Sequence, residues 1–346
     1  MSDRAARLFE AECCFQLGLS ERAASLYQSV LQEDPGCREA VVRLNQLQRP
    51  TPPPATGKLT VIWQVDPASP GIWEGDWLRS LLSGLDYAEV VDTRHTAAAH
   101  QSLIIDRRID GARLDYYTGC YRTGARFALL HLGDEGFGDD RLVYEYCELV
   151  LRNYWSPVLA QQRKVSFLPL GYKSGFRLDG KRKRASERKY RWSFLGDPNK
   201  STRPQMLDAL GKVAPAFVHE TAAFIDPNAM PVSEYQAVLE DSVFAPCPAG
   251  FLNLDSFRIC EALECGCIPV VESRLGLDYY TALFGSGHPL LVAPDWNEAR
   301  RRMQALIADP AALEARRQAC ARWWQDYRVR LRRDVAQTLR DALGLA

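Results

Sequence analysis

The sequence predicts an α/β protein with two parallel-sheet domains and a small all-helical extension at the N-terminus. Two series of short apolar runs alternate with helical stretches, one before and one after the basic segment 181–190. This alternation is typical of parallel sheets wrapped by helices. The chain of 346 residues is long enough for two or three domains of ordinary size.

The extension occupies residues 1–48 and is predicted to form a helical hairpin followed by a further helix over 38–47. Apolar and small side chains recur at steps of three and four residues, as on one face of a helix. Their order resembles a single tetratricopeptide repeat, with Ala11, Gly18, Ala23, Tyr27 and Pro35 at the characteristic places. The alternative is a plain helical hairpin. Because one repeat cannot bury its own apolar face, we expect it to pack on the main body or on a protein partner.

A proline-rich linker at 49–57 (RPTPPPATG) separates the extension from the first α/β domain, which we place at 58–180. Linkers of this composition are stiff. Strands of the first domain are expected at 59–65, 88–91, 102–105, 127–132, 149–151 and 165–168, with helices at 77–84 and 141–147.

The second α/β domain, 190–312, follows the basic segment 181–190, which we interpret as a solvent-exposed connector. Its strands are expected at 192–195, 216–219, 243–246, 268–271 and 290–292, with helices at 204–213, 234–240, 255–265 and 298–307. Residues 313–346 are expected to add C-terminal helices. A cleft between two such domains is the default site for a small molecule.

The composition excludes several classes of protein. Lys+Arg and Asp+Glu both number 43, and this balance argues against nucleic acid or an anionic membrane as a partner. No apolar run is long enough to span a membrane, and the N-terminal residues are too polar for a secretory signal. The ten cysteines follow no zinc-binding spacing, so we expect free, buried thiols. Together these features predict a soluble, cytoplasmic protein without a membrane segment.

The most informative stretch of the sequence is 244–271 (FAPCPAGFLNLDSFRICEALECGCIPVV). It predicts a strand, a loop in which Gly250 is expected to contact the nucleotide, and a helix for which Asp255 is the expected N-cap. The free backbone N–H groups at a helix N-terminus suit a phosphate group. Ser256 and Phe257 fall in the first turn, and the Arg258 guanidinium is able to bind a diphosphate with two hydrogen bonds.

One turn further along the same helix, Glu261 is expected to accept hydrogen bonds from ribose hydroxyls, as acidic residues do in nucleotide-binding folds. This assignment completes a nucleotide site made of a helix N-terminus, a cation and a carboxylate.

The run DSFRICEALECGCIPVV resembles the signature of exostosin-type glycosyltransferases. The segments at 129–135 (LLHLGDE) and 151–176 resemble the ribitol-phosphate xylosyltransferase branch of that group. The resemblance covers about residues 58–310 and leaves the helical extension outside it. It implies the GT-B architecture, in which two Rossmann-like domains face each other across a cleft and the C-terminal domain holds the nucleotide sugar.

The same resemblance implies a metal-independent, inverting transfer. The sequence has no Asp-x-Asp triplet, which metal-dependent GT-A enzymes use to bind a cation on the sugar diphosphate. We therefore expect no cofactor and no metal, and the charge of the leaving diphosphate must be neutralised by helix ends and cationic side chains. Besides Arg258, the expected cations are Lys200 and Arg203, which follow a strand and begin a helix. The alternative is that they only mark an exposed helix start.

An inverting transfer needs a base that takes the proton of the acceptor hydroxyl. Asp134 and Glu135 are the first candidates, because the xylosyltransferase-like segment includes them. Glu74 and Asp76, after the first strand, are the alternatives, and His131 is a candidate for orienting a phosphate or the base. Structural roles are the competing interpretation: Asp134 as a helix cap, Glu135 in an ion pair, and His131 as a strand-end residue.

These observations predict transfer of a sugar from a nucleotide diphosphate, expected to be a UDP-sugar, to a hydroxyl of a glycan or polyol-phosphate acceptor. The competing hypothesis is a catalytically idle scaffold that binds partners through its helical hairpin. A P-loop kinase is disfavoured because the sequence lacks the Gly-x4-Gly-Lys-Ser/Thr loop.

Overall fold

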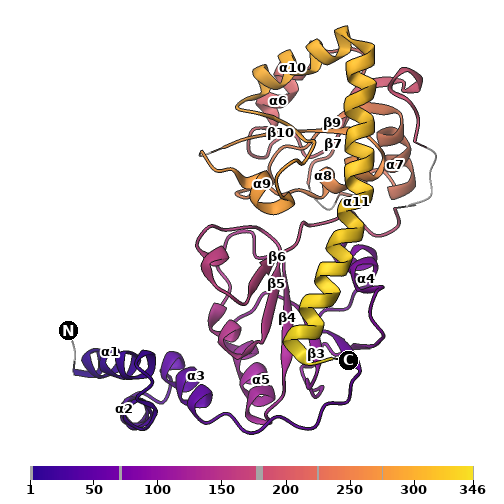
Figure 1. Cartoon of the computed structure of the whole chain (residues 1–346). Helices are drawn as coiled ribbons and strands as arrows, with labels where there is room; N and C mark the ends of the chain where they lie inside the picture. The colour runs from indigo at the N-terminus through magenta and orange to yellow at the C-terminus, as the bar shows by residue number, and fades with distance from the viewer. Residues whose placement is uncertain (1–2, 70–71, 177–181, 224–225, 275, 346) are drawn as a thin grey trace.

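The computed structural model describes residues 3–69, 72–176, 182–223, 226–274 and 276–345. Two sheets of parallel strands lie one above the other in Figure 1, each with helices around it. The helices of residues 3–47 extend from the lower sheet domain. The predicted α/β class with two sheet domains and a helical N-terminus is therefore confirmed.

The first domain contains a six-stranded parallel sheet in the order β2-β1-β3-β4-β5-β6. Its strands are β1 (Leu59–Trp63), β2 (Tyr87–Val91), β3 (Ser102–Arg107), β4 (Phe127–Leu132), β5 (Leu149–Arg152) and β6 (Val165–Phe167), and its helices are α4 (Gly75–Leu82) and α5 (Gly111–Arg122). The central strands β3 and β4 are buried almost throughout, which explains their continuous apolar sequence. The helix expected at 141–147 is a short 3₁₀ helix at Arg141–Tyr146.

The second domain has a five-stranded parallel sheet in the order β11-β10-β9-β7-β8. Its strands are β7 (Tyr190–Gly196), β8 (Ala216–Glu220), β9 (Ser242–Pro246), β10 (Ile268–Glu272) and β11 (Leu291–Ala293). Its helices are α6 (Arg203–Leu210), α7 (Val232–Glu240), α8 (Phe257–Glu264), α9 (Tyr279–Phe284) and α10 (Trp296–Ala308). In both sheets the order of strand addition reverses beside the first strand. β1 lies between β2 and β3, and β7 lies between β8 and β9. Ligands of open α/β sheets bind at the carboxyl ends of the strands near such a reversal.

A single long helix, α11 (Pro310–Leu343), takes the place of the separate C-terminal helices expected at 313–346. Figure 1 shows it running from the second domain back along the first. Its last turn is held by the first domain, because Gln101 and Arg126 donate hydrogen bonds to the carbonyls of Leu343 and Ala342.

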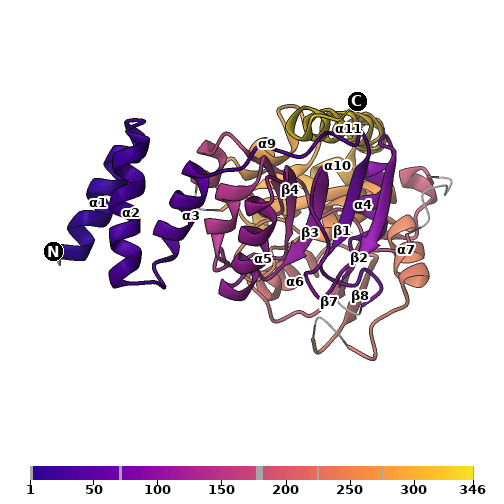
Figure 2. The same cartoon turned by 90° about the horizontal axis from the view of Figure 1, so that it is seen from below.

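The helical extension consists of α1 (Asp3–Gln16), α2 (Ser20–Glu33) and α3 (Arg38–Leu47). Figure 2 shows α1 and α2 projecting away from the sheet domains, with α3 between them and the body. α3 contacts the first domain through polar side chains: Asn45 donates to the Tyr146 hydroxyl at 2.9 Å and Gln46 to the carbonyl of Glu145 at 3.1 Å. The extension thus rests on the main body, and its classification as a tetratricopeptide repeat remains a prediction.

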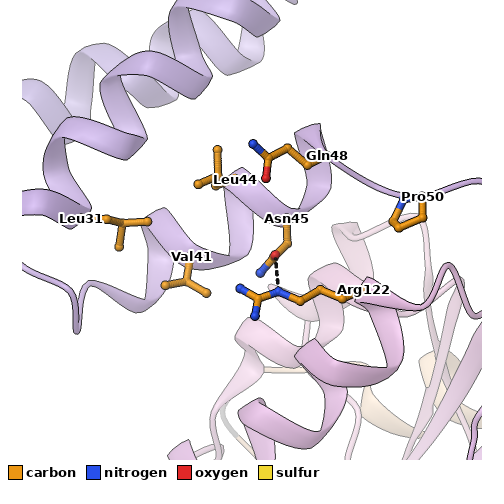
Figure 3. Close-up of a pocket in the computed structure, with 7 residues that line it drawn as sticks. All are labelled: Leu31, Val41, Leu44, Asn45, Gln48, Pro50 and Arg122. Carbon is orange, nitrogen blue, oxygen red and sulfur yellow. Dashed lines mark hydrogen bonds between the residues drawn. The ribbon is translucent and has the colours of Figure 1, made fainter.

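A cavity of about 310 Å³ lies between the extension and the first domain. Figure 3 shows the side chains around it and the hydrogen bond from Arg122 of α5 to Asn45 of α3, 2.8 Å long. Its lining comes from α2, α3, the proline-rich linker and α5: Leu31, Val41, Leu44, Asn45, Gln48, Pro50 and Arg122.

The basic connector is exposed at several positions, but not throughout as its composition led us to expect. Lys181 lies outside the described residues, but Arg188 is buried and donates to the carbonyls of Leu239, Ser242 and Cys265. These carbonyls belong to the ends of α7 and α8 and the start of β9, so the connector fastens three elements of the second domain.

Candidate active site

A cavity of about 590 Å³ lies between the two domains, at the carboxyl ends of their strands. The first domain lines it with residues that follow β3, β4 and β5, and the second with residues that follow β7, β8 and β9. All the cation and nucleotide residues expected from the sequence line this cavity: Lys200, Arg203, Gly250, Ser256, Phe257, Arg258 and Glu261.

The N-terminus of α8 opens into this cavity with Ser256, not Asp255, as the N-cap. The Ser256 hydroxyl accepts the backbone N–H of Arg258 at 3.3 Å. Asp255 is instead shared between the domains: one carboxylate oxygen accepts the N–H of Leu170 at 3.0 Å and the other that of Ser256 at 2.8 Å. Burial raises the pKa of Asp255 to about 7.

Arg203 and Arg258 form the cationic wall of the cavity in the second domain. Arg258 donates to the carbonyl of Leu195 at 2.6 Å, an approach that requires Gly196, since a Cβ there would overlap the guanidinium. Arg203 donates to the carbonyls of Asp197 at 2.8 Å and Ala249 at 3.3 Å.

Neither arginine is fully satisfied by the protein. The Nε atoms of Arg203 and Arg258 are buried and have no hydrogen-bond partner among the described residues. Burial, followed by the nearby charge of Arg258, lowers the pKa of Arg203 to about 10. One buried and one half-buried guanidinium group that repel each other would both be stabilised by a nearby anion.

Lys200 and Phe257 lie at the rim of the same wall. The Lys200 ammonium pairs with Asp197 at 3.6 Å and lies 4.5 Å from the centroid of the Phe251 ring. Phe257 packs edge-on against Trp73 of the first domain, with ring centroids 6.1 Å apart.

Glu261 is almost completely buried, and protein groups contact both of its oxygens. One oxygen accepts the Tyr235 hydroxyl at 2.7 Å and the other the backbone N–H of Lys173 at 3.4 Å. The predicted ribose contact would share these oxygens with the two protein donors.

Of the four candidate bases, only Glu135 lines the cavity. Its Oε1 accepts three consecutive backbone N–H groups of the second domain, from Phe251, Leu252 and Asn253 at 2.8, 2.9 and 3.1 Å. The described residues offer no hydrogen bond to its Oε2.

Asp134, by contrast, points into the first domain, and the structure does not support it as a base. Its carboxylate accepts the N–H groups of Gly138 and Asp139 at 2.8 and 3.3 Å and pairs with the buried Arg152 at 3.3 Å. It shapes the loop after β4 instead of meeting a substrate.

His131 is also outside the cavity lining, buried under this loop. Its ring nitrogens lie 2.7 Å from the Tyr144 hydroxyl and 2.8 Å from the Asp139 carboxylate. The structural interpretation of His131 therefore accounts for its position, and a phosphate contact does not.

The two alternative bases also lie outside the cavity lining. Asp76 is exposed and accepts the N–H of Gly175 at 2.9 Å. Glu74 is buried beside Arg107, and its Oε1 has no partner among the described residues. Burial raises the pKa of Glu74, and the charge of Arg107 opposes that shift.

Within the described part of the chain, no three potential metal ligands gather into a metal-binding group. The same part of the chain contains no helix of the length and apolarity that crossing a membrane requires.

The second domain and α11 together resemble a known protein family. Residues 176–343 match the family model described as the RXYLT1 C-terminal domain. This part of the chain is similar to the RXYLT1 C-terminal domain. The match confirms the predicted resemblance to exostosin-type enzymes, and the chain is a glycosyltransferase.

Solved structures support the GT-B fold of this RXYLT1-like chain. The Anabaena protein Alr3699/HepE, in complex with UDP and glucose, matches with a TM-score of 0.52 at 11% identity, over 82% of this chain and 100% of that one. The DNA-modifying enzyme β-glucosyltransferase matches with a TM-score of 0.51 at 9% identity, over 83% of this chain and 100% of that one. No curated protein matches the sequence.

The first domain contributes cavity residues that the sequence did not assign individually. Trp73, Arg107, Arg108, Lys173 and Tyr154 line its side of the cavity of this RXYLT1-like chain. Burial lowers the pKa of Lys173, the charge of Glu261 opposes this shift, and the charge of Arg258 adds to it.

One signal for two of these residues was present in the sequence, because Arg108 and Tyr154 lie one and two positions after the ends of β3 and β5. Both adopt positive φ angles, 59° and 61°, which non-glycine residues rarely do and which are common at functional sites.

Proposed function

We propose that this chain transfers a sugar from a UDP-sugar to a hydroxyl of a polyol-phosphate or saccharide acceptor, with inversion and without a metal. The observation that carries the proposal is the pair of arginines, Arg203 and Arg258, whose buried Nε atoms have no partner among the described residues, beside the N-terminus of α8 in a cavity between two domains. A diphosphate would complement the charge of the two arginines and accept hydrogen bonds from the helix N-terminus.

The donor is assigned to the second domain. The diphosphate would lie against the N-terminus of α8, with the Ser256 hydroxyl and the two arginines as donors, and Glu261 would accept from the ribose. The choice of UDP is supported by Alr3699/HepE, which shares the fold and whose structure contains UDP.

The acceptor is assigned to the first domain. Arg107, Arg108 and Lys173 add three cations to this side of the cavity, opposite those of the donor site. An acceptor that carries a phosphate group would be held by such cations, whereas a neutral glycan would not need them.

In the proposed reaction, the Oε2 atom of Glu135 takes the proton of the acceptor hydroxyl while the oxygen attacks the anomeric carbon. The bond from that carbon to the diphosphate oxygen breaks, and the negative charge of the leaving UDP is stabilised by Arg203, Arg258 and the N–H groups of α8. Cationic side chains and the helix end would then do the work that a metal does in other transferases.

A ligand-binding panel tests the donor assignment. We expect UDP to raise the melting temperature of the protein more than GDP, ADP or CMP does, since a ligand at 100 times its Kd adds about 2.7 kcal/mol of stability. In Arg258→Ala, UDP should bind about 10- to 100-fold more weakly, as for a lost charged hydrogen bond, while uridine should bind unchanged. Equal UDP affinity in the variant and the wild type would remove Arg258 from the site.

An assay with excess EDTA tests the metal-free mechanism. We expect an unchanged rate of sugar transfer, and loss of activity that Mn²⁺ or Mg²⁺ restores would refute this part of the proposal. No thermal shift with any nucleotide would favour the idle-scaffold hypothesis.

A further inference from the structure

The loop 250–253 of the second domain holds a carboxylate that belongs to the first. Three consecutive N–H groups converge on the Oε1 atom of Glu135, and the residues that make these bonds are 116 to 118 positions away in the sequence. Consecutive backbone N–H groups that point to one spot form an anion-binding concavity.

The absence of a side chain at Gly250 makes room for this carboxylate. A Cβ at this position would lie 2.9 Å from Oε1 and 3.4 Å from Oε2 of Glu135. We predicted from the sequence that Gly250 contacts the nucleotide, but its nearest neighbour across the cavity is Glu135.

Hydrogen bonds within the second domain hold the loop 250–253 in place. Arg203 donates to the carbonyl of Ala249 at 3.3 Å, and the Asn253 side chain accepts the N–H of Asp255 at 3.1 Å and the Tyr279 hydroxyl at 2.5 Å. The side chains of Phe251 and Leu252 are exposed while their N–H groups bind Glu135.

We infer that the loop 250–253 is a positioning element for the catalytic base. By binding Oε1 it orients Glu135 and leaves Oε2 to accept the proton. Because the base comes from one domain and its support from the other, Glu135 is aligned only when the two domains are closed. This inference rests on the proposed role of Glu135 as the base.

The variant Gly250→Ala tests the inference with little cost to the fold, because the added methyl meets only the end of a flexible side chain. It should lower kcat by about 10- to 100-fold, as misplaced catalytic groups do, and leave the Kd for UDP within about twofold of the wild type. Gly136→Ala is the matched control, since a Cβ there contacts nothing within 4 Å. It should retain wild-type kcat.

A double-mutant cycle shows whether Gly250 acts through Glu135. Glu135→Gln should lower kcat at least as much as Gly250→Ala, and the double variant should be no slower than Glu135→Gln alone. Glu135→Asp provides an independent test if Gly250→Ala folds poorly: it keeps the charge but is one methylene too short to reach the loop. It should lose kcat with an unchanged Kd for UDP.

The outcomes separate the two proposals. Full activity of Glu135→Gln would overturn its role as the base and with it the proposed mechanism. An impaired Glu135→Gln together with a fully active Gly250→Ala would overturn the positioning role alone. Tighter UDP binding in Glu135→Gln would also overturn it, because the loop would then be a phosphate site that Glu135 blocks.

Discussion

Asp255 lines the cavity. One of its carboxylate oxygens accepts the backbone N–H of Leu170 and the other accepts that of Ser256. Two hydrogen bonds favour the ionised form, but removal from water favours the neutral form more strongly. The result is a rise in the pKa of this carboxyl from 3.8 to about 7.

This shift predicts a pH-dependent stability. Between pH 4 and 7 the folded state keeps the Asp255 proton and the unfolded state releases it, so the free energy of unfolding falls as the pH rises through this window. The contribution is on the order of 4 kcal/mol over the whole window. We expect Asp255→Asn to lose less thermal stability than the wild type between pH 5 and pH 8.

Melting temperatures at several pH values check this prediction, with the exposed Asp208 as the control position. Asp208→Asn should follow the wild-type pH profile. Parallel profiles for Asp255→Asn and the wild type would contradict the assignment.

The surroundings of an acidic side chain also decide the roles of Asp134 and Glu135. They are neighbours in the sequence and carry the same functional group, yet one is paired with Arg152 inside the first domain and the other lines the cavity. The glycine before them, Gly133, has a φ of 76°, and this left-handed turn after β4 helps to separate their directions.

Among the structural elements, the connector between the domains was expected to be exposed to solvent, yet it contains a buried arginine. The buried Arg188 donates to Ser242 at 2.5 Å and to Cys265 at 3.0 Å, and it reaches Leu239 at 3.3 Å. The last carbonyls of a helix have no partner within the helix, and a cationic side chain satisfies them well.

Arg188→Met should therefore destabilise the second domain by about 3 kcal/mol or more, because it keeps the aliphatic stem and leaves three carbonyls without their donor. Thermal unfolding measures the effect. Arg184→Met, at an exposed position of the same connector, should be nearly neutral. Equal melting temperatures for the two variants would show that the Arg188 contacts contribute little.

At the scale of the whole molecule, α11 joins the two domains (Figure 1). Trp324 of this helix stacks on Trp77 of α4, with ring centroids 5.8 Å apart, and donates to Glu264 of α8 at 2.6 Å. Gly171 completes the contact: its φ is 80°, and a Cβ there would overlap the Trp77 ring. One buried tryptophan thus connects α4 of the first domain with α8 of the second.

Trp324→Ala should lower the stability by roughly 3–5 kcal/mol, as expected for removal of a large buried aromatic side chain. Because the lost contact joins the domains, we expect the single thermal transition to broaden or divide into two. Differential scanning calorimetry measures both effects. Val329→Ala, at an exposed position on the same helix, is the control, and a Trp324→Ala melt that coincides with it would contradict this role for α11.

The sequence by itself determined the alternation of strands and helices, the division into two sheet domains and the helix start near 256–258 that lines the cavity. These features depend on apolar periodicity and on backbone groups that are neighbours along the chain, so local sequence carries them. α5 escaped prediction because its buried face is made largely of tyrosine and polar side chains, including Tyr117, Thr118 and Tyr121, which give little contrast with the exposed face.

Only the tertiary structure decided which acidic residue meets the cavity, that Arg107 and Lys173 share it with Arg258, and that Gly250 accommodates Glu135. These relations join residues about a hundred positions apart, on two different sheets. No local pattern encodes them, because they arise from how the carboxyl ends of the two sheets face each other.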